Sequence, residues 1–145
     1  MTEATSERRL LAIDDNADSA ELIARVAGKC GYAAQSMSDT RTLSEVLKSW
    51  NPQVLTLDLC MPQEDGIALI SSIKASGFSG ALIIISGQDD WLRRAAAKLA
   101  VARGIDVVHD MSKPIDVKTL RDLLAKLDNL SAPRYEDERA QANAS

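Results

Sequence analysis

The sequence predicts a doubly wound α/β fold, and three observations carry this prediction. Short apolar runs of strand length alternate with amphipathic segments of helical period, five times along the chain. Strands separated by helices connect through right-handed crossovers into a parallel sheet with helices on both faces. A length of 145 residues suits one domain with its own core. We therefore expect a flavodoxin-like (βα)5 domain, with strand order 2-1-3-4-5 and its site at the carboxyl ends of the strands.

The first half of the chain is predicted to contain three strands and two helices. The strands are short apolar runs at residues 9–14, 32–37 and 54–58. The first helix, over residues 17–29, stops before Gly31 and keeps one apolar face: Leu22, Ile23, Val26 and Cys30. The second helix is capped by Asp39 or Thr40 and broken at Asn51-Pro52, and its apolar face is Leu43, Val46, Leu47 and Trp50.

The second half repeats this alternation. The clearest strand, over residues 81–85, is short, β-branched and apolar throughout, as expected for a strand buried on both faces. A further strand is predicted from Ile105 to about His109, and helices are predicted over residues 66–75, 89–103 and 116–130. The last helix is expected to point five apolar side chains inward: Val117, Leu120, Leu123, Leu124 and Leu127.

Composition and charge exclude several classes of protein. Hydrophobic residues make up 46% and charged residues 26%, which argues against global disorder. No apolar run approaches the ~20 residues of a membrane span, and the polar start lacks the apolar stretch of a signal peptide. A net charge of −4, from 17 basic and 21 acidic residues, gives no electrostatic footprint for nucleic acid. We expect a soluble, cytoplasmic protein that binds neither membrane nor nucleic acid.

The domain is expected to span residues 9–130, between an N-terminal extension over residues 1–8 and a polar C-terminal tail over residues 131–145. The tail carries Pro133 and is expected to be frayed or disordered; the alternative is a helical extension that contributes to dimer contacts. We find no internal repeat and no second domain in the sequence.

Polar side chains follow the predicted strands at one edge of the sheet. Asp14 and Asp15 follow the first strand, and Asp58 ends the third. Ser86 follows the fourth strand, and Lys113 comes after the fifth. Any one of these residues alone is more often a turn or a helix cap. Because the carboxyl ends of parallel strands meet at the same edge, their joint placement predicts a common site.

The expected carboxylate cluster predicts both a metal ion and a reaction. Converging carboxylates repel one another unless a cation neutralises them. Hard oxygen ligands in a small open site suit Mg²⁺, whereas a single histidine, His109, and two distant cysteines do not favour zinc. The lysine can hold a phosphoryl oxygen, and the serine can donate its hydroxyl. These groups together predict phosphoryl transfer, in which a carboxylate can form an aspartyl-phosphate.

Four short motifs in this order identify a family resemblance. From about residue 9 to residue 130 the chain resembles the receiver domain of bacterial two-component response regulators. The most specific motif is D-x-x-M-P-x-x-D-G, which begins at Asp58 and ends at Gly66. The other three are Ile13-Asp14-Asp15-Asn16, Ile85-Ser86-Gly87 and Lys113-Pro114.

The resemblance implies a role for each matched residue. Asp58 would accept the phosphoryl group from a sensor histidine kinase. Ser86 would hydrogen-bond that group, and Lys113 would pair with it. Gly66 would supply backbone freedom in the loop after the phosphorylated strand. Mg²⁺ would be bound by Asp58 and three further ligands: Asp15 directly, Asp14 through water, and the backbone carbonyl of Cys60.

Two features qualify the resemblance. The family's switch aromatic, about three residues before the lysine, is missing: Asp110 has that spacing and His109 lies beside it, and either can take its place. The stretch from Gly104 to Lys113 is longer than is common in the family. In this stretch, in the run after Ile85 and in the Ala-rich segment before Gly104, the chain is similar to receivers fused to EAL-type cyclic-di-GMP phosphodiesterase domains.

The resemblance favours a single-domain response regulator that assists its own phosphorylation and dephosphorylation but is not otherwise an enzyme. It would signal through phosphorylation-dependent protein contacts. Its partners would be a sensor histidine kinase and a phosphotransfer protein or effector, with a homodimer as a further option. Trp91 either packs on its own helix or lies on a partner-binding face.

Two other functions remain as alternatives. A pseudo-receiver would dock or dimerise without phosphorylation, and the missing aromatic favours it mildly. A small Mg²⁺-dependent phosphatase would need a carboxylate two residues after its nucleophile, where this chain has Cys60.

Overall fold

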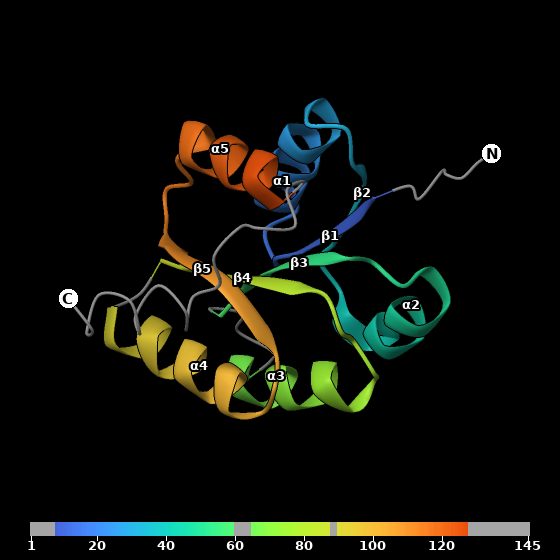
Figure 1. Cartoon of the computed structure of the whole chain (residues 1–145), viewed down its shortest axis with the longest axis vertical. Helices are drawn as coiled ribbons and strands as arrows, with labels where there is room; N and C mark the ends of the chain where they lie inside the picture. The colour runs from blue at the N-terminus through green and yellow to red at the C-terminus, as the bar shows by residue number, and fades with distance from the viewer. Residues whose placement is uncertain (1–7, 60–64, 88–89, 128–145) are drawn as a thin grey trace.

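The parallel sheet of five strands is the centre of the molecule. The computed structural model describes residues 8–59, 65–87 and 90–127 (Figure 1). The strand order is β2-β1-β3-β4-β5, and every pair is parallel, which confirms the predicted fold and strand order. The strands are β1 (Arg9–Ile13), β2 (Ala33–Met37), β3 (Val54–Asp58), β4 (Ala81–Ser86) and β5 (Asp106–Ser112).

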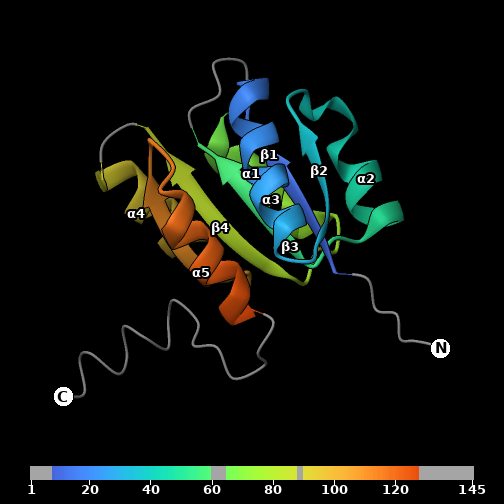
Figure 2. The same ribbon diagram turned by 90° about the horizontal axis from the view of Figure 1, so that it is seen from above.

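Helices cover both faces of the sheet. On one face lie α1 (Ala17–Lys29) and α5 (Val117–Leu127), which are in front of the sheet in Figure 2. On the other face lie α2 (Leu43–Trp50), α3 (Gly66–Ala75) and α4 (Asp90–Ala102). No helix in residues 8–59, 65–87 and 90–127 is long and apolar enough to cross a membrane.

Alternating side chains of the central strands supply a core to each helical layer. On β3 and β4, Leu55, Leu57 and Ile84 pack in the cluster beneath α2, α3 and α4. Ile83 and Ile85 pack in the second cluster, against α1 and α5. Every residue of β3 and β4 is buried, which explains why these strands are apolar runs without polar alternation.

Local signals set the ends of the helices much as the sequence predicts. Asn16 caps α1 by accepting a hydrogen bond from the Ser19 amide at 3.0 Å. Gly31, with φ of 93°, allows the chain to turn after α1. Asp39 caps a 3₁₀ turn that directly precedes α2, and Asn51 ends α2 in the left-handed region with φ of 52°.

Two sequence predictions differ from the structure. Val117 was expected to face inward, but it is 37% exposed because it lies in the first turn of α5, ahead of the fully buried Leu120 and Leu124. The last strand continues past His109 to Ser112, because β5 pairs with β4 as far as Ser86. The tail over residues 131–145, the end of the predicted last helix and most of the N-terminal extension lie outside the described residues.

An irregularity in β5 accounts for its length. Leu82 of β4 is paired with Val107, whereas the next residue, Ile83, is paired with His109. Val108 is therefore one extra residue on β5, as in a β-bulge. From this point onward the register of β5 against β4 is displaced by one residue, which decides which face of the sheet each later side chain occupies.

Candidate functional site

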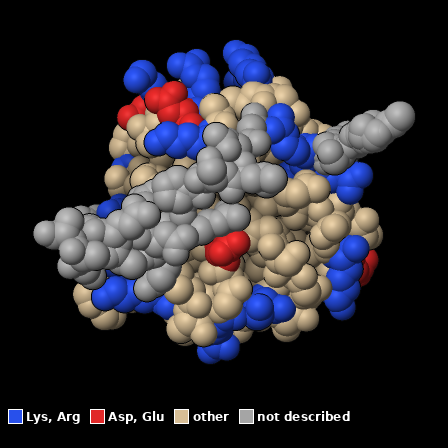
Figure 3. All heavy atoms as spheres, viewed as in Figure 1, with Lys and Arg blue, Asp and Glu red and all other residues tan. Residues whose placement is uncertain are grey.

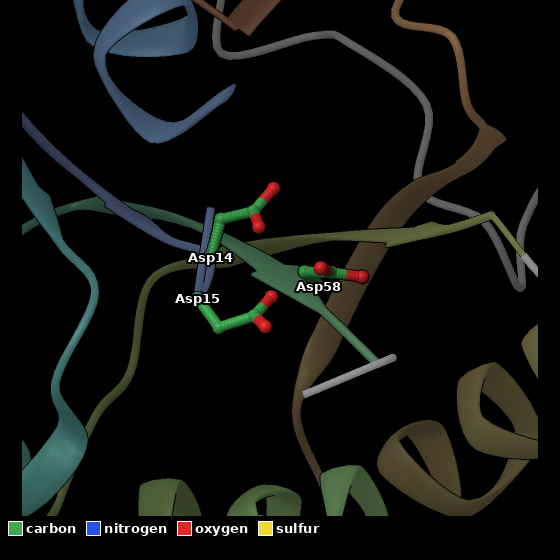
Figure 4. Close-up of side chains that lie close together, drawn as sticks. All are labelled: Asp14, Asp15 and Asp58. Carbon is green, nitrogen blue, oxygen red and sulfur yellow. The ribbon is translucent and has the colours of Figure 1, made fainter. Parts of the chain in front are cut away.

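Three carboxylates gather at the carboxyl ends of β1 and β3. Asp14 and Asp15 directly follow β1, and Asp58 is the last residue of β3. Figure 4 shows these side chains next to one another, and one carboxylate oxygen of each lies within 4.8 Å of the others. Asp14 and Asp58 are buried, while Asp15 is exposed, so the cluster opens to solvent on the Asp15 side.

Lys113 closes the cluster from the end of β5. Its Nζ lies 2.9 Å from Asp14 Oδ2 and donates a hydrogen bond to Asp58 Oδ2 at 3.1 Å. Burial acts to lower the pKa of Lys113, but the hydrogen bonds and charges of Asp14 and Asp58 outweigh it, so the pKa lies above its ordinary value. The lysine is therefore a fixed positive charge between two buried carboxylates.

Backbone hydrogen bonds hold the ends of the strands in place around this cluster. The Asp14 amide donates to the Met37 carbonyl at 3.0 Å, and Asp14 Oδ1 accepts from the Asn16 amide at 2.9 Å. The Lys113 amide donates to the Ser86 carbonyl at 3.0 Å. Ser86 is fully buried at the end of β4, beside Lys113. The structure thus brings the serine and the lysine to the edge where the carboxylates lie.

Gly66 is explained by a close backbone approach. A Cβ at this position would lie 3.0 Å from the Leu59 side chain and 3.1 Å from the Leu59 Cα and carbonyl oxygen. Gly66, the first residue of α3, therefore packs directly against Leu59, the residue that follows Asp58. Conformational freedom, the predicted reason for Gly66, is not needed here, since its φ is not among the positive glycine values found at Gly31, Gly77 and Gly104.

The composition of the cluster fits a divalent cation. Three carboxylates and one ammonium carry formal charges of −3 and +1, which leave two negative charges uncompensated. A doubly charged, hard cation would neutralise them, and Mg²⁺ is held by few carboxylates together with several waters. Asp14, Asp15 and Asp58 are the residues that would hold it. The backbone carbonyl of Cys60, also predicted as a ligand, lies outside the described residues.

At the edge of the sheet, the bulge decides which residue faces α4. Without the extra residue, His109 would be paired with Ile84; with it, Asp110 is paired with Ile84 and turns toward α4. There Asp110 Oδ2 lies 3.9 Å from Arg93 Nε, and both side chains are mostly buried, at 17% and 12% exposure. Asp110 rather than His109 therefore occupies the position between β5 and α4.

Sequence reasoning did not single out Arg93. A helical pattern could have found it, because Arg93 lies three, four and seven residues before Ala96, Ala97 and Ala100, which are fully buried. A charged residue on the apolar face of a helix needs a nearby opposite charge. Trp91, in contrast, is 75% exposed, so it does not pack on its own helix.

Comparisons with known proteins agree with this fold. A family model described as "Response regulator receiver domain" matches residues 10–125. The response regulator MprA of Mycobacterium leprae is 26% identical over 138 residues, which cover 94% of this chain and 56% of the relative. The chain therefore spans about half the length of the curated relatives that it matches.

Solved structures show the same architecture. A response regulator from Colwellia psychrerythraea is 27% identical with a TM-score of 0.75, over 86% of this chain and 98% of that one. A response regulator from Burkholderia pseudomallei, solved with a phosphorylated aspartic acid, a calcium ion and citrate, is 22% identical with a TM-score of 0.67. That match covers 96% of this chain and 74% of that one, and at this identity it shows the fold alone.

Fold and site together define a class: a doubly wound α/β domain with an acidic, lysine-bridged pocket at the carboxyl ends of its strands. Within that class, the chain belongs to the response regulator receiver domain family. The family of two-component signalling proteins predicted from the four sequence motifs is thereby confirmed. The closer likeness to receivers of EAL-type regulators stays a prediction.

Proposed function

We propose that this receiver domain accepts a phosphoryl group on Asp58 from a sensor histidine kinase, and signals by phosphorylation-dependent protein contacts. The observation that carries the proposal is the position of Asp58: a buried carboxylate bonded to Lys113 and clustered with Asp14 and Asp15. The domain assists its own phosphorylation and dephosphorylation and is not otherwise an enzyme. We place this activity in the cytoplasm, with the kinase and an effector or phosphotransfer protein as partners.

The pocket residues would divide the work of the transfer. An Asp58 carboxylate oxygen would attack the phosphorus as the bond to the donor nitrogen breaks, which leaves an acyl phosphate on Asp58. Lys113 would pair with one phosphoryl oxygen, and the Ser86 hydroxyl would donate a hydrogen bond to another. Mg²⁺, bound by Asp14, Asp15, Asp58 and the Cys60 carbonyl, would supply charge neutralisation. The Burkholderia structure, with a phosphorylated aspartate and a calcium ion, supports this combination by analogy.

Intact mass after incubation with Mg²⁺ and acetyl phosphate tests the proposal. We expect a gain of one phosphoryl group that requires Mg²⁺ and is absent in Asp58→Asn. Beryllofluoride binding, measured on the same proteins, separates two kinds of failure. Binding without phosphorylation would show a competent pocket that needs its own kinase as donor. Absence of both would contradict the proposal and favour a docking module that works without phosphorylation.

A further inference from the structure

The two outer strands of the sheet, β2 and β5, differ in how they are protected against pairing with another chain. β5 carries Asp106 and Asp110 and contains the bulge. Charges and bulges on an outer strand are common means of preventing edge-to-edge pairing. β2 has the sequence Ala-Ala-Gln-Ser-Met, without charge, proline or glycine, and its register with β1 is unbroken. In the part of the chain that the structure describes, β2 is therefore the less protected edge (Figure 2).

The side chains in the middle of β2 are accessible and uncharged. Gln35 is paired with Leu11 of β1, whose side chain packs in the cluster beneath α2, α3 and α4. Gln35 therefore points to the layer of α2, yet its side chain is exposed, as is that of Ser36. Charged side chains lie instead over the helical layers: Figure 3 shows them over α1 and α5 at the top of the visible face and over α3 and α4 at the bottom.

The parallel pairing with β1 leaves alternate residues of β2 with outward backbone groups. The Ala33 amide donates a hydrogen bond across this pairing at 2.7 Å, and at the other end of the strand the Met37 carbonyl accepts one at 3.0 Å. In a parallel ladder the N–H and C=O groups of one residue point to the same side, and those of the next residue to the opposite side. The backbone groups of Gln35 therefore face β1, and those of Ala34 and Ser36 face away from the sheet.

We propose that β2 pairs antiparallel with β2 of a second copy of this chain, about a two-fold axis at Gln35. In this register Ala34 of each copy lies opposite Ser36 of the other, and each such pair exchanges two backbone hydrogen bonds. Every outward backbone group of Ala34 and Ser36 is then used in both copies, and the two sheets become one continuous sheet. The interface is isologous, because the same residues meet from both sides.

The occupant is a second copy because this edge is complementary to itself. The outward residues lie symmetrically on either side of Gln35, so the two-fold axis matches donors with acceptors without a shift in register. Gln35 lies opposite its own counterpart, where like charges would repel, and it carries none. The pairing uses residues outside the acidic pocket, so it goes beyond the proposed function and does not depend on it.

Charge at Gln35 tests the two-fold pairing directly. Residues directly opposite each other in an antiparallel pair have Cβ atoms about 4.5–5.5 Å apart. Gln35→Lys would therefore bring two ammonium groups together, and Gln35→Glu two carboxylates, whereas a mixture of the two variants would bring opposite charges together. The matched controls are Ser72→Lys and Ser72→Glu, which add the same charges at an exposed position of α3.

Sedimentation equilibrium of the full chain, over a series of protein concentrations and without a phosphodonor, measures the dissociation constant of the dimer. We expect wild type and the two Ser72 variants to associate alike, and each Gln35 variant alone to associate about tenfold or more weakly. An equimolar mixture of Gln35→Lys and Gln35→Glu should restore association. A monomeric wild type, undiminished association of the single Gln35 variants, or a mixture that stays monomeric would overturn the proposal.

Amide hydrogen exchange locates the interface on the strand. The amides of Ala34 and Ser36 should exchange more slowly as the protein concentration rises, whereas the Gln35 amide, which faces β1, should not change. Ser36→Pro removes an outward donor without removing a hydrogen bond to β1, and it should abolish the concentration dependence at Ala34. Exchange at Ala34 and Ser36 that does not vary with concentration in wild type would overturn the proposal, as would concentration-dependent protection at β5 instead.

Discussion

At the centre of the sheet, β1 and β3 end in carboxylates that are almost completely buried and share one lysine. At the β5 edge, Asp110 and Arg93 form a longer contact in which the carboxylate is more exposed and the cation less exposed than at the centre, and Trp91 is exposed to solvent. The two central carboxylates, Asp14 and Asp58, are withdrawn from water, so each depends strongly on the charge of Lys113. The edge carries weaker interactions on an outer strand and its helix. The comparison teaches that the tightly coupled charges lie at the centre of the sheet, whereas the β5 edge holds a single, longer pair.

The largest effect is expected from removing the lysine at the centre. In Lys113→Met, Asp14 and Asp58 remain buried without their cation, so the free energy of unfolding should fall by about 2–3 kcal/mol. The matched control is Lys118→Met, which breaks the surface pair with Asp122 and should cost less than about 0.5 kcal/mol. Urea denaturation at neutral pH measures both. Equal losses of unfolding free energy in the two variants would show that the ion pairs of Lys113 contribute no more than an exposed pair.

A second large effect is expected at the glycine that packs beside Asp58. Gly66→Ala would force a Cβ to 3.1 Å from the Leu59 backbone, and should destabilise the domain by about 2 kcal/mol. Gly28→Ala is the matched control, since a Cβ there meets nothing within 4 Å. Because alanine favours helix over glycine, this control should stabilise the domain by about 0.5–1 kcal/mol. Thermal unfolding of both proteins is the measurement, and a stable Gly66→Ala would contradict the close approach.

A smaller effect is expected at the edge. A double-mutant cycle of Arg93→Gln and Asp110→Asn should give a coupling energy of about 0.5–1 kcal/mol, because the pair is mostly buried but its atoms are 3.9 Å apart. The cycle of Lys118→Gln and Asp122→Asn, a pair at 3.7 Å on the exposed side of α5, serves as the comparison. A coupling energy no larger than that of the surface pair would show that the contact between Arg93 and Asp110 does not hold α4 to β5.

The smallest effect is a dependence on alkaline pH. The folded-state pKa of Lys113 is raised, so the stabilisation from its positive charge is fully present below the ordinary lysine pKa near 10.5. This stabilisation is lost as the pH rises through the higher pKa of the folded state. Wild type should therefore lose stability more steeply than Lys113→Met above that pH. Denaturant midpoints across the alkaline range measure this, and parallel curves would contradict the raised pKa.

Much of the fold and the composition of the pocket could be predicted from local sequence. The parallel sheet with helices on both faces followed from five strand–helix alternations and the handedness of crossovers, and the strand order followed from the flavodoxin-like type assigned to it. The convergence of Asp14, Asp58 and Lys113 followed from their positions at strand ends. These predictions succeed because helical and strand periods are short-range properties, and because a parallel sheet places all its carboxyl ends on one edge.

Other features needed the tertiary structure. Whether His109 or Asp110 faces α4 depends on one extra residue in β5, and no local pattern shows where a strand absorbs it. The reason for Gly66 is a close contact with Leu59 that only the tertiary structure creates. The exposure of Trp91 and Val117 likewise depends on what packs against the starts of α4 and α5. The sequence alone determined which residues share the sheet edge; register and packing, which join segments far apart in the chain, decided which of them touch.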